Sequence, residues 1–315
     1  MTERTLYIVV SVDIDEDGFD KNLFTGTHGV TWKGVDEGVP KILQSLKGYR
    51  DSSGEQIKYT WFVRCDKQLE NLYGDPAYLF KRFQVIWKES KTRGDEIAWH
   101  FHAYDHEPSI INNEKQLVKD LKECFLSSKS DSLNISASRV GRAFCSNGIM
   151  EALDEVGLKV DSTALPGRER KDGLNSLDWE ITPELPFFPS LNDYRIPGNE
   201  HVDLLEVPMS MIETMVPYDS RPIKRYANLT FKNSVIGRSL CKYIRENDLL
   251  VTIMHPSELI SQREHPLLSF NVNEVRKNLD TIQLECERIG KSIKFITITE
   301  VLSLLKYGLI NLARG

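Results

Sequence analysis

The sequence predicts an α/β fold built around a parallel sheet of about seven to eight strands. Eight short runs rich in apolar and β-branched residues recur along the 315 residues, and amphipathic helical patterns lie between several of them. Such strand–helix alternation is typical of parallel sheets, whether open or closed. Eight candidate strands favour a (β/α) barrel. Because no linker, repeat or low-complexity tract divides the chain, we predict a single domain over residues 1–315.

The predicted strands are short and mostly apolar, as expected for strands buried on both faces. They are residues 6–14, 57–63, 96–102, 138–144, 158–163, 204–210, 249–255 and 293–298. The clearest helical patterns are residues 36–49, 76–90, 113–128, 147–158 and 272–290. One further stretch, residues 164–203, carries five prolines without clean periodicity. A long irregular segment inside a compact domain is usually functional, so we predict a substrate-side loop there.

Charge and composition exclude several function classes. The net charge is −6, so the chain has no basic field that would hold nucleic acid or an anionic membrane. No apolar stretch approaches the roughly 20 residues of a membrane span, and no secretion signal is visible. The five cysteines are scattered without a C-x-x-C pair, which predicts reduced thiols. We therefore expect a cytoplasmic protein.

Residues 95–108, DEIAWHFHAYDHEP, hold three of the seven histidines. His102 and His106 have the spacing that brings two imidazoles to one side of a helical turn, and His100 and His102 would share one face of a strand. A lone histidine is more often a surface or hydrogen-bonded core residue. Three of them at the end of an apolar run favour a metal site.

A carboxylate commonly completes a metal site that has two histidines, and VVSVDIDEDG offers several. Asp13, Asp15 and Asp17 lie where the first predicted strand leaves the sheet, at the end where parallel α/β folds build their sites. A calcium loop is excluded because its twelfth position is Phe24 instead of Glu. The alternative is a solvated acidic turn. His255 ends a late strand in the same way, which favours a functional role.

Together these residues resemble the polysaccharide deacetylases, the NodB-homology group of carbohydrate esterase family 4. SVDID is similar to the family's first motif, which would make Asp13 the catalytic base and Asp15 a metal ligand. HAYDHEP is similar to the second motif, with His102 and His106 as the other ligands. The family usually has Ser or Thr where this chain has Ala103.

The resemblance leaves one ligand open and adds further roles. DEIAWH also looks like the approach to the second motif, so His100 is kept in reserve as a ligand. GRAFC resembles the third motif, in which Arg142 would hold the base carboxylate, although the usual R-x-P-Y-G is absent. His255 would be the general acid. The irregular loop would supply three residues that contact sugar: Asp178, Trp179 and Tyr194.

The resemblance covers the chain from Leu6 to about Leu305 and implies a deformed (β/α) barrel with a divalent metal, Zn²⁺ by expectation. The implied reaction is removal of an acetyl or formyl group from an amide nitrogen of a saccharide. A cytoplasmic location points to a soluble or lipid-linked precursor in polysaccharide biosynthesis. Two alternatives stay open: a hydrolase of non-sugar amides or ureides with the same barrel, and a carbohydrate-binding protein whose metal site has decayed.

Overall fold

The computed structural model describes residues 4–17, 31–103, 114–129, 133–170, 177–260 and 264–314. Its backbone contacts divide the chain into two compact units, and each is built from separate stretches of sequence. Unit 1 comprises Met1–Tyr59 and Ser210–Ile296, and unit 2 comprises Thr60–Met209 and Thr297–Gly315. The prediction of a single domain is not tested by this division.

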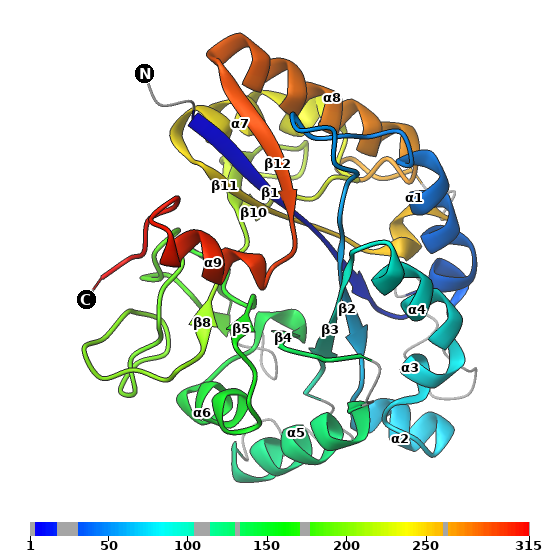
Figure 1. Ribbon diagram of the computed structural model, residues 1–315, viewed down its shortest axis with the longest axis vertical. Helices are drawn as coiled ribbons and strands as arrows, with labels where there is room; N and C mark the ends of the chain where they lie inside the picture. Colours follow the sequence, from blue (N-terminus) through cyan, green and yellow to red (C-terminus); the bar gives the residue numbers. More distant parts are fainter. Residues whose placement is uncertain are drawn as a thin grey trace. The chain divides into compact units, whose positions relative to one another are not determined.

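Unit 1 is organised around β1 (Arg4–Ile14), which is buried along nearly its whole length. It pairs in parallel with β11 (Leu249–Met254) on one side and β12 (Lys291–Ile296) on the other. A run of apolar residues in the middle strand of a parallel sheet is expected, because helices cover both faces. Figure 1 shows the helices of this unit alongside these strands.

The remaining elements of unit 1 surround these three strands. A π-helical turn (Gly34–Gly38) leads into α1 (Val39–Ser45), and a hairpin pairs β9 with β10. The hairpin and the two long helices have the following bounds: β9 (Met211–Thr214), β10 (Ile223–Tyr226), α7 (Asn233–Glu246) and α8 (Val272–Ile289). The helix α8 begins at the Asn271 cap, whose side chain accepts the backbone N–H of Asn273.

Unit 2 contains five parallel strands in the order in which they occur in the sequence. They are β2 (Thr60–Arg64), β3 (Glu96–Phe101), β4 (Ala137–Val140), β5 (Val160–Asp161) and β8 (Leu205–Glu206). Right-handed crossovers through helices are the usual connection between such neighbours. The helices of this unit are α2 (Lys67–Tyr73), α3 (Tyr78–Arg82), α4 (Gln84–Thr92), α5 (Glu114–Ser128), α6 (Asn147–Glu155) and α9 (Glu300–Lys306).

The described residues thus contain eight parallel strands, three in unit 1 and five in unit 2. The predicted α/β class and the expected strand number are thereby confirmed. Each of the eight predicted runs contains or overlaps one of these strands. Helix α7 and the hairpin formed by β9 and β10 were not predicted from the sequence.

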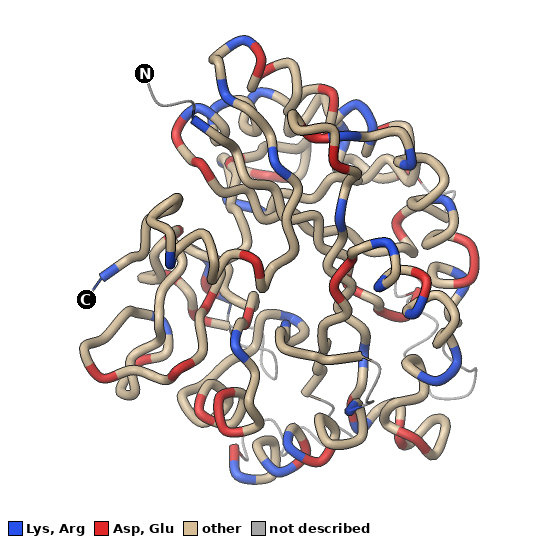
Figure 2. The backbone as a smooth tube through the Cα atoms, viewed as in Figure 1, with Lys and Arg blue, Asp and Glu red and all other residues tan. Residues whose placement is uncertain are grey.

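The stretch 164–203 is irregular, as predicted. Its described part has only the two-residue strands β6 (Glu169–Arg170) and β7 (Leu177–Asp178), together with isolated bridges. Along the described backbone of both units, acidic and basic residues are interspersed without a large region of one sign (Figure 2). Among the described helices, none has the length and apolarity that a membrane crossing requires.

Candidate active site

Two strand ends of unit 1 bring acidic and imidazole groups together. Val12 of β1 lies opposite Met254 of β11, so Asp13 and His255 leave the sheet at the same edge. Asp13 is buried, with 3% of its surface exposed, whereas Asp15 is half-buried just beyond the end of β1. This placement is what the carboxyl ends of parallel strands provide.

His255 is held in one orientation by a carboxylate. Its Nδ1 lies 3.0 Å from Glu258 Oε1, and its Nε2 lies 3.9 Å from Asp15 Oδ2. Since an ionised carboxylate can only accept, Nδ1 carries a hydrogen in this arrangement. Burial by itself lowers the pKa of His255, but the charge and hydrogen bond of Glu258, with the charges of Asp13 and Asp15, raise that pKa to about 10.

Glu258 was not identified from the sequence, although its carboxylate holds the His255 ring. It is 2% exposed and accepts Asn228 Nδ2 at 3.0 Å, Thr230 Oγ1 at 2.7 Å and the backbone N–H of His255 at 3.1 Å. Burial raises its pKa, yet the His255 charge and these hydrogen bonds bring the pKa below its ordinary value. The sequence did offer a signal, because Glu258 stands three residues after His255. A Glu at that spacing commonly accepts the backbone N–H of the residue that caps the helical turn, here His255.

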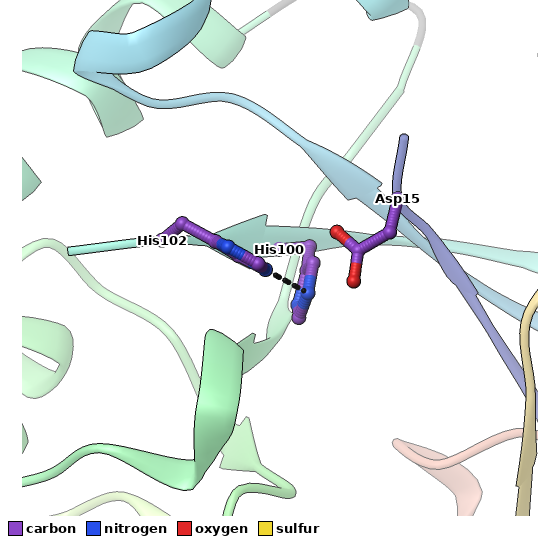
Figure 3. A group of neighbouring side chains, drawn as sticks. All are labelled: Asp15, His100 and His102. Atoms are coloured by element: carbon purple, nitrogen blue, oxygen red, sulfur yellow. Dashed lines mark hydrogen bonds between the residues drawn. The ribbon is translucent and has the colours of Figure 1, made fainter. Parts of the chain in front are cut away.

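Unit 2 contributes two histidines from β3 and the residue that follows it. His100 is 2% exposed, and its Nδ1 lies 2.8 Å from the backbone oxygen of Arg139. A carbonyl only accepts, so Nδ1 donates and Nε2 presents a lone pair. That Nε2 lies 2.9 Å from His102 Nε2, with the two rings inclined at 75° (Figure 3).

The position of His102 depends on the absence of a side chain at Gly141. A Cβ added to Gly141 would lie 2.0 Å from His102 Cδ2 and 2.3 Å from its Nε2. Real Cβ atoms do not approach other atoms so closely, and glycine is the residue that permits close backbone approach. Gly141 begins the short 3-10 turn that follows β4.

Two arginines near this turn, Arg139 and Arg142, lie in different environments. Arg139 lies within β4 and is 1% exposed, and its Nε donates to the backbone oxygen of Ser162 at 2.7 Å. Its guanidinium carbon also lies 4.2 Å from the ring centroid of Phe62. Arg142, the residue predicted to hold the base, is exposed and has a φ of 58°. Sequence reasoning passed over Arg139 because a charged residue between small and apolar ones was read only as part of a strand.

The three residues predicted to contact sugar are not equivalent. Trp179 is fully buried, and its Nε1 donates to the backbone oxygen of Ala143 at 2.8 Å. Its ring packs edge-on against Tyr194, with centroids 4.9 Å apart, so the side chain has no open face for a ligand. Asp178 and Tyr194 are half-buried. Asp178 forms an ion pair with Arg195.

One group of metal-ligand residues stands out within the described ranges: Asp15, His100 and His102. His100 and His102 supply two imidazoles from unit 2, and Asp15 supplies a carboxylate from unit 1; Figure 3 draws the three side chains. His106, which the sequence paired with His102, lies outside the described residues. His100, kept in reserve at first, belongs to the group.

The donors of unit 2 suit a metal ion on structural grounds. A metal-bound histidine commonly donates its other ring N–H to a backbone carbonyl, as His100 does to Arg139. Two histidine nitrogens bound tetrahedrally to zinc at about 2.0–2.1 Å would be about 3.3 Å apart. The observed Nε2–Nε2 separation of 2.9 Å is close to that spacing. Two imidazoles and a carboxylate are a donor set that zinc accepts.

No protein-family model matches the chain, and no curated protein matches it in sequence. Among solved structures, it is similar to the catalytic domain of peptidoglycan N-acetylglucosamine deacetylase from Eubacterium rectale. That match has 11% identity, a TM-score of 0.42, and coverage of 100% of this chain and 96% of the other. The family 4 carbohydrate esterase from Streptomyces lividans, solved with acetate, matches with 8% identity, a TM-score of 0.39 and 95% coverage of both chains.

A third likeness is to 4-alpha-glucanotransferase from Thermococcus litoralis, with 11% identity and a TM-score of 0.46. It covers 94% of this chain but only 38% of that enzyme. All three TM-scores lie below 0.5, so these likenesses carry no argument about activity.

Proposed function

We propose that the protein is a metal-dependent hydrolase that removes an acetyl or formyl group from an amide nitrogen of a saccharide. The observation that carries this proposal is the pair of imidazoles in unit 2. Their Nε2 atoms face each other, and the tautomer of His100 is fixed by a backbone carbonyl. In this proposal both units act as one catalytic domain, with Asp15 of unit 1 completing the ligand set.

The residues that would hold the ion are Asp15, His100 and His102, with His106 as a further candidate. We expect Zn²⁺, because its usual donors are histidine nitrogen and carboxylate oxygen in a small coordination number. A bound divalent ion would supply Lewis-acid polarisation of the carbonyl and a more acidic water.

The residues of unit 1 would move the protons. Asp13 would accept a proton from the attacking water, and His255 would donate one to the nitrogen as the C–N bond breaks. Amide and water then give a free amine and a carboxylate. Glu258 would fix the orientation of His255. Its carboxylate accepts the N–H of His255 Nδ1, so that His255 Nε2 points toward Asp15.

We assign the arginine that orients Asp13 to Arg139 in place of Arg142. A buried guanidinium on β4 has a fixed geometry, whereas Arg142 is exposed on a turn. An arginine beside a carboxylate favours its ionised form, which a general base requires. Arg142 follows Gly141 in the turn after β4.

The substrate proposed is a soluble or lipid-linked saccharide precursor, used in the cytoplasm during polysaccharide synthesis. The test is a panel of N-acetylated sugars, N-formylated sugars and small non-sugar amides. Acyl release should require a divalent metal, should disappear on chelation and should return with Zn²⁺. Release from non-sugar amides alone would support the alternative hydrolase. Saccharide binding without metal and without release would support a binding protein.

Asp13→Asn separates the two carboxylates of the first strand. We expect this variant to keep its metal by elemental analysis and to lose turnover, because Asn cannot accept the proton of the water. Exposed His201 of unit 2 supplies a matched control, and His201→Gln should keep both metal and activity. Loss of metal in Asp13→Asn would mean that the roles of Asp13 and Asp15 are assigned wrongly.

A further inference from the structure

Two acidic side chains are completely buried side by side in unit 2. Asp161 of β5 and Glu206 of β8 lie directly opposite each other in the strand register, and both are 0% exposed. Paired positions on neighbouring parallel strands point to the same face, with the strands about 4.8 Å apart. Both residues occupy the last position of their strands.

Each carboxyl has one oxygen bonded to a neighbour and one directed at the other acid. Asp161 Oδ1 accepts the hydroxyl of Ser138 at 2.6 Å, and Glu206 Oε1 accepts the backbone N–H of Ala164 at 2.8 Å. Their other oxygens, Oδ2 and Oε2, are buried and meet no donor from the described chain. The two carboxyl groups are hydrogen-bonding neighbours of each other, and Thr163 adds its hydroxyl beside Asp161 and its backbone N–H beside Glu206. Two carboxyl groups form a hydrogen bond with each other only when one of them is protonated.

The charged and titratable groups that face this pair are few. Burial raises the pKa of Asp161, and the Arg139 guanidinium acts against that rise. The thiol of Cys145 faces both acids, and burial with their charges raises its pKa well above the ordinary value, so it stays neutral. Burial and the charge of Asp161 raise the pKa of Glu206 well above its ordinary value. The Arg139 charge favours the ionised form of Asp161. The proton therefore belongs on Glu206.

The pair is also connected to Arg139 through Ser162, the residue that follows β5. Arg139 donates to the backbone oxygen of Ser162 at 2.7 Å and to its hydroxyl at 3.0 Å. That hydroxyl donates to the backbone oxygen of Val207 at 2.8 Å, the residue after Glu206. A buried arginine needs a negative partner to offset its charge.

We propose that Asp161 and Glu206 share a single proton at neutral pH, carried by Glu206, and that the remaining charge on Asp161 positions Arg139. The second half of this proposal rests on the proposed function, in which Arg139 orients the base Asp13. Asp161 and Glu206 are thus positioning residues that contact neither substrate nor metal.

Infrared spectroscopy tests the shared proton without any substrate. With ¹³C-labelled carboxyl groups, the native protein at neutral pH should show the C=O stretch of a protonated acid, and Glu206→Gln should lack it. Glu285→Gln is the matched control, because Glu285 is also buried but arginines lower its pKa to about 2. Absence of the band in the native protein, or its survival in Glu206→Gln, would overturn the proposal.

The dependence of stability on pH gives a second test. Because the folded protein keeps a proton that the unfolded chain releases above the ordinary pKa of Glu, stability must fall as pH rises through that window. One proton changes the unfolding equilibrium constant by about tenfold per pH unit. Glu206→Gln should remove this slope between about pH 5 and pH 7. Equal slopes in the variant and the native protein would contradict a shared proton.

Activity tests the positioning role. Gln can donate to Asp161 as protonated Glu206 does, so Glu206→Gln keeps the charge beside Arg139, whereas Asp161→Asn removes it. We expect Asp161→Asn to lower kcat by about tenfold to a hundredfold, the cost of a charge-assisted hydrogen bond, with metal content retained. Glu206→Gln should lower kcat by a clearly smaller factor than Asp161→Asn. Equal losses would refute positioning by charge. If no substrate is turned over at all, the proposed function fails, and the infrared and stability results still decide the shared proton.

Discussion

The two units fix their candidate catalytic groups by different physical means. In unit 1, His255 is held by the buried charge of Glu258, which itself collects donors from Asn228 and Thr230. In unit 2, the imidazoles are held by a backbone carbonyl and by the close approach of Gly141. The first arrangement depends on ionisation, whereas the second depends on shape.

This difference suits the two tasks proposed for them. A proton donor needs a partner that keeps its proton in place, and a buried carboxylate provides it. A metal ligand must present a lone pair, so a neutral acceptor that fixes the tautomer serves better than a charge. The comparison therefore predicts that charge removal will damage unit 1, and that added volume will damage unit 2.

The largest effect is expected from His100→Ala. It removes the buried ligand and the hydrogen bond to the Arg139 carbonyl, so we expect the metal content to fall to background and acyl release to stop. Elemental analysis and turnover of the same preparation check both. Full metal content in this variant would remove His100 from the site and favour the pair of His102 and His106.

Gly141→Ala should break unit 2 through shape alone. Its Cβ would overlap the His102 ring, which must rotate away. A displacement of about 1 Å at a reacting group can cost about a hundredfold in rate, so we expect kcat/KM to fall at least that far. Metal affinity should fall as well.

The control for this change is Gly48→Ala. A Cβ on Gly48 meets nothing within 4 Å, so activity and metal affinity should be retained. If Gly141→Ala also kept native kinetics, shape would not be the factor that holds His102.

The sequence predicts the parts of the fold that a run of apolar residues can reveal. Strands such as β1 and β11 are buried on both faces, so their runs stand out, and the residues after them are easily placed at strand ends. Helix α7 does carry a regular apolar stripe, Ile236, Leu240, Tyr243 and Ile244, which was overlooked in the sequence. Short antiparallel pairs such as β9 with β10 have no comparable signature.

Site residues were found at or just beyond the carboxyl ends of predicted strands, as at Asp13, Asp15, His100, His102 and His255. Arg139 and Glu258 were missed because each lies in a segment read for its structure, a strand and the turn after His255. The pairing of Asp161 with Glu206 could not be read at all. It depends on the register of β5 with β8, which a long irregular loop separates in sequence.

Glu258→Gln is the corresponding test of unit 1. The substitution keeps the shape but removes the charge that holds His255, so we expect kcat to fall by about a hundredfold or more, the range of general acid catalysis. Metal content should remain native, in contrast to Gly141→Ala. Glu285→Gln removes a buried charge of the same unit on α8 and should leave kcat native. Native kcat in Glu258→Gln would show that His255 needs no charged partner.

The smallest effect should come from Thr230→Val, which removes one of the donors to Glu258 and keeps the shape. Thr230 Oγ1 donates to Glu258 Oε2 at 2.7 Å, and Asn228 and His255 still supply donors to this carboxylate after the substitution. A single buried hydrogen bond contributes about 1 kcal/mol, and somewhat more when the acceptor is charged. We expect a loss of about 1–3 kcal/mol in the free energy of unfolding by denaturant titration.

The sign of the pH dependence follows from the lowered pKa of Glu258. The stabilisation that its charge provides is present above the pKa of Glu in the unfolded chain and disappears as pH falls. The destabilisation by Thr230→Val should therefore be full at neutral pH and shrink in acid. A penalty that is equal in acid and at neutral pH would mean that packing of the Thr230 side chain, and not the charge on Glu258, determines its contribution to unit 1.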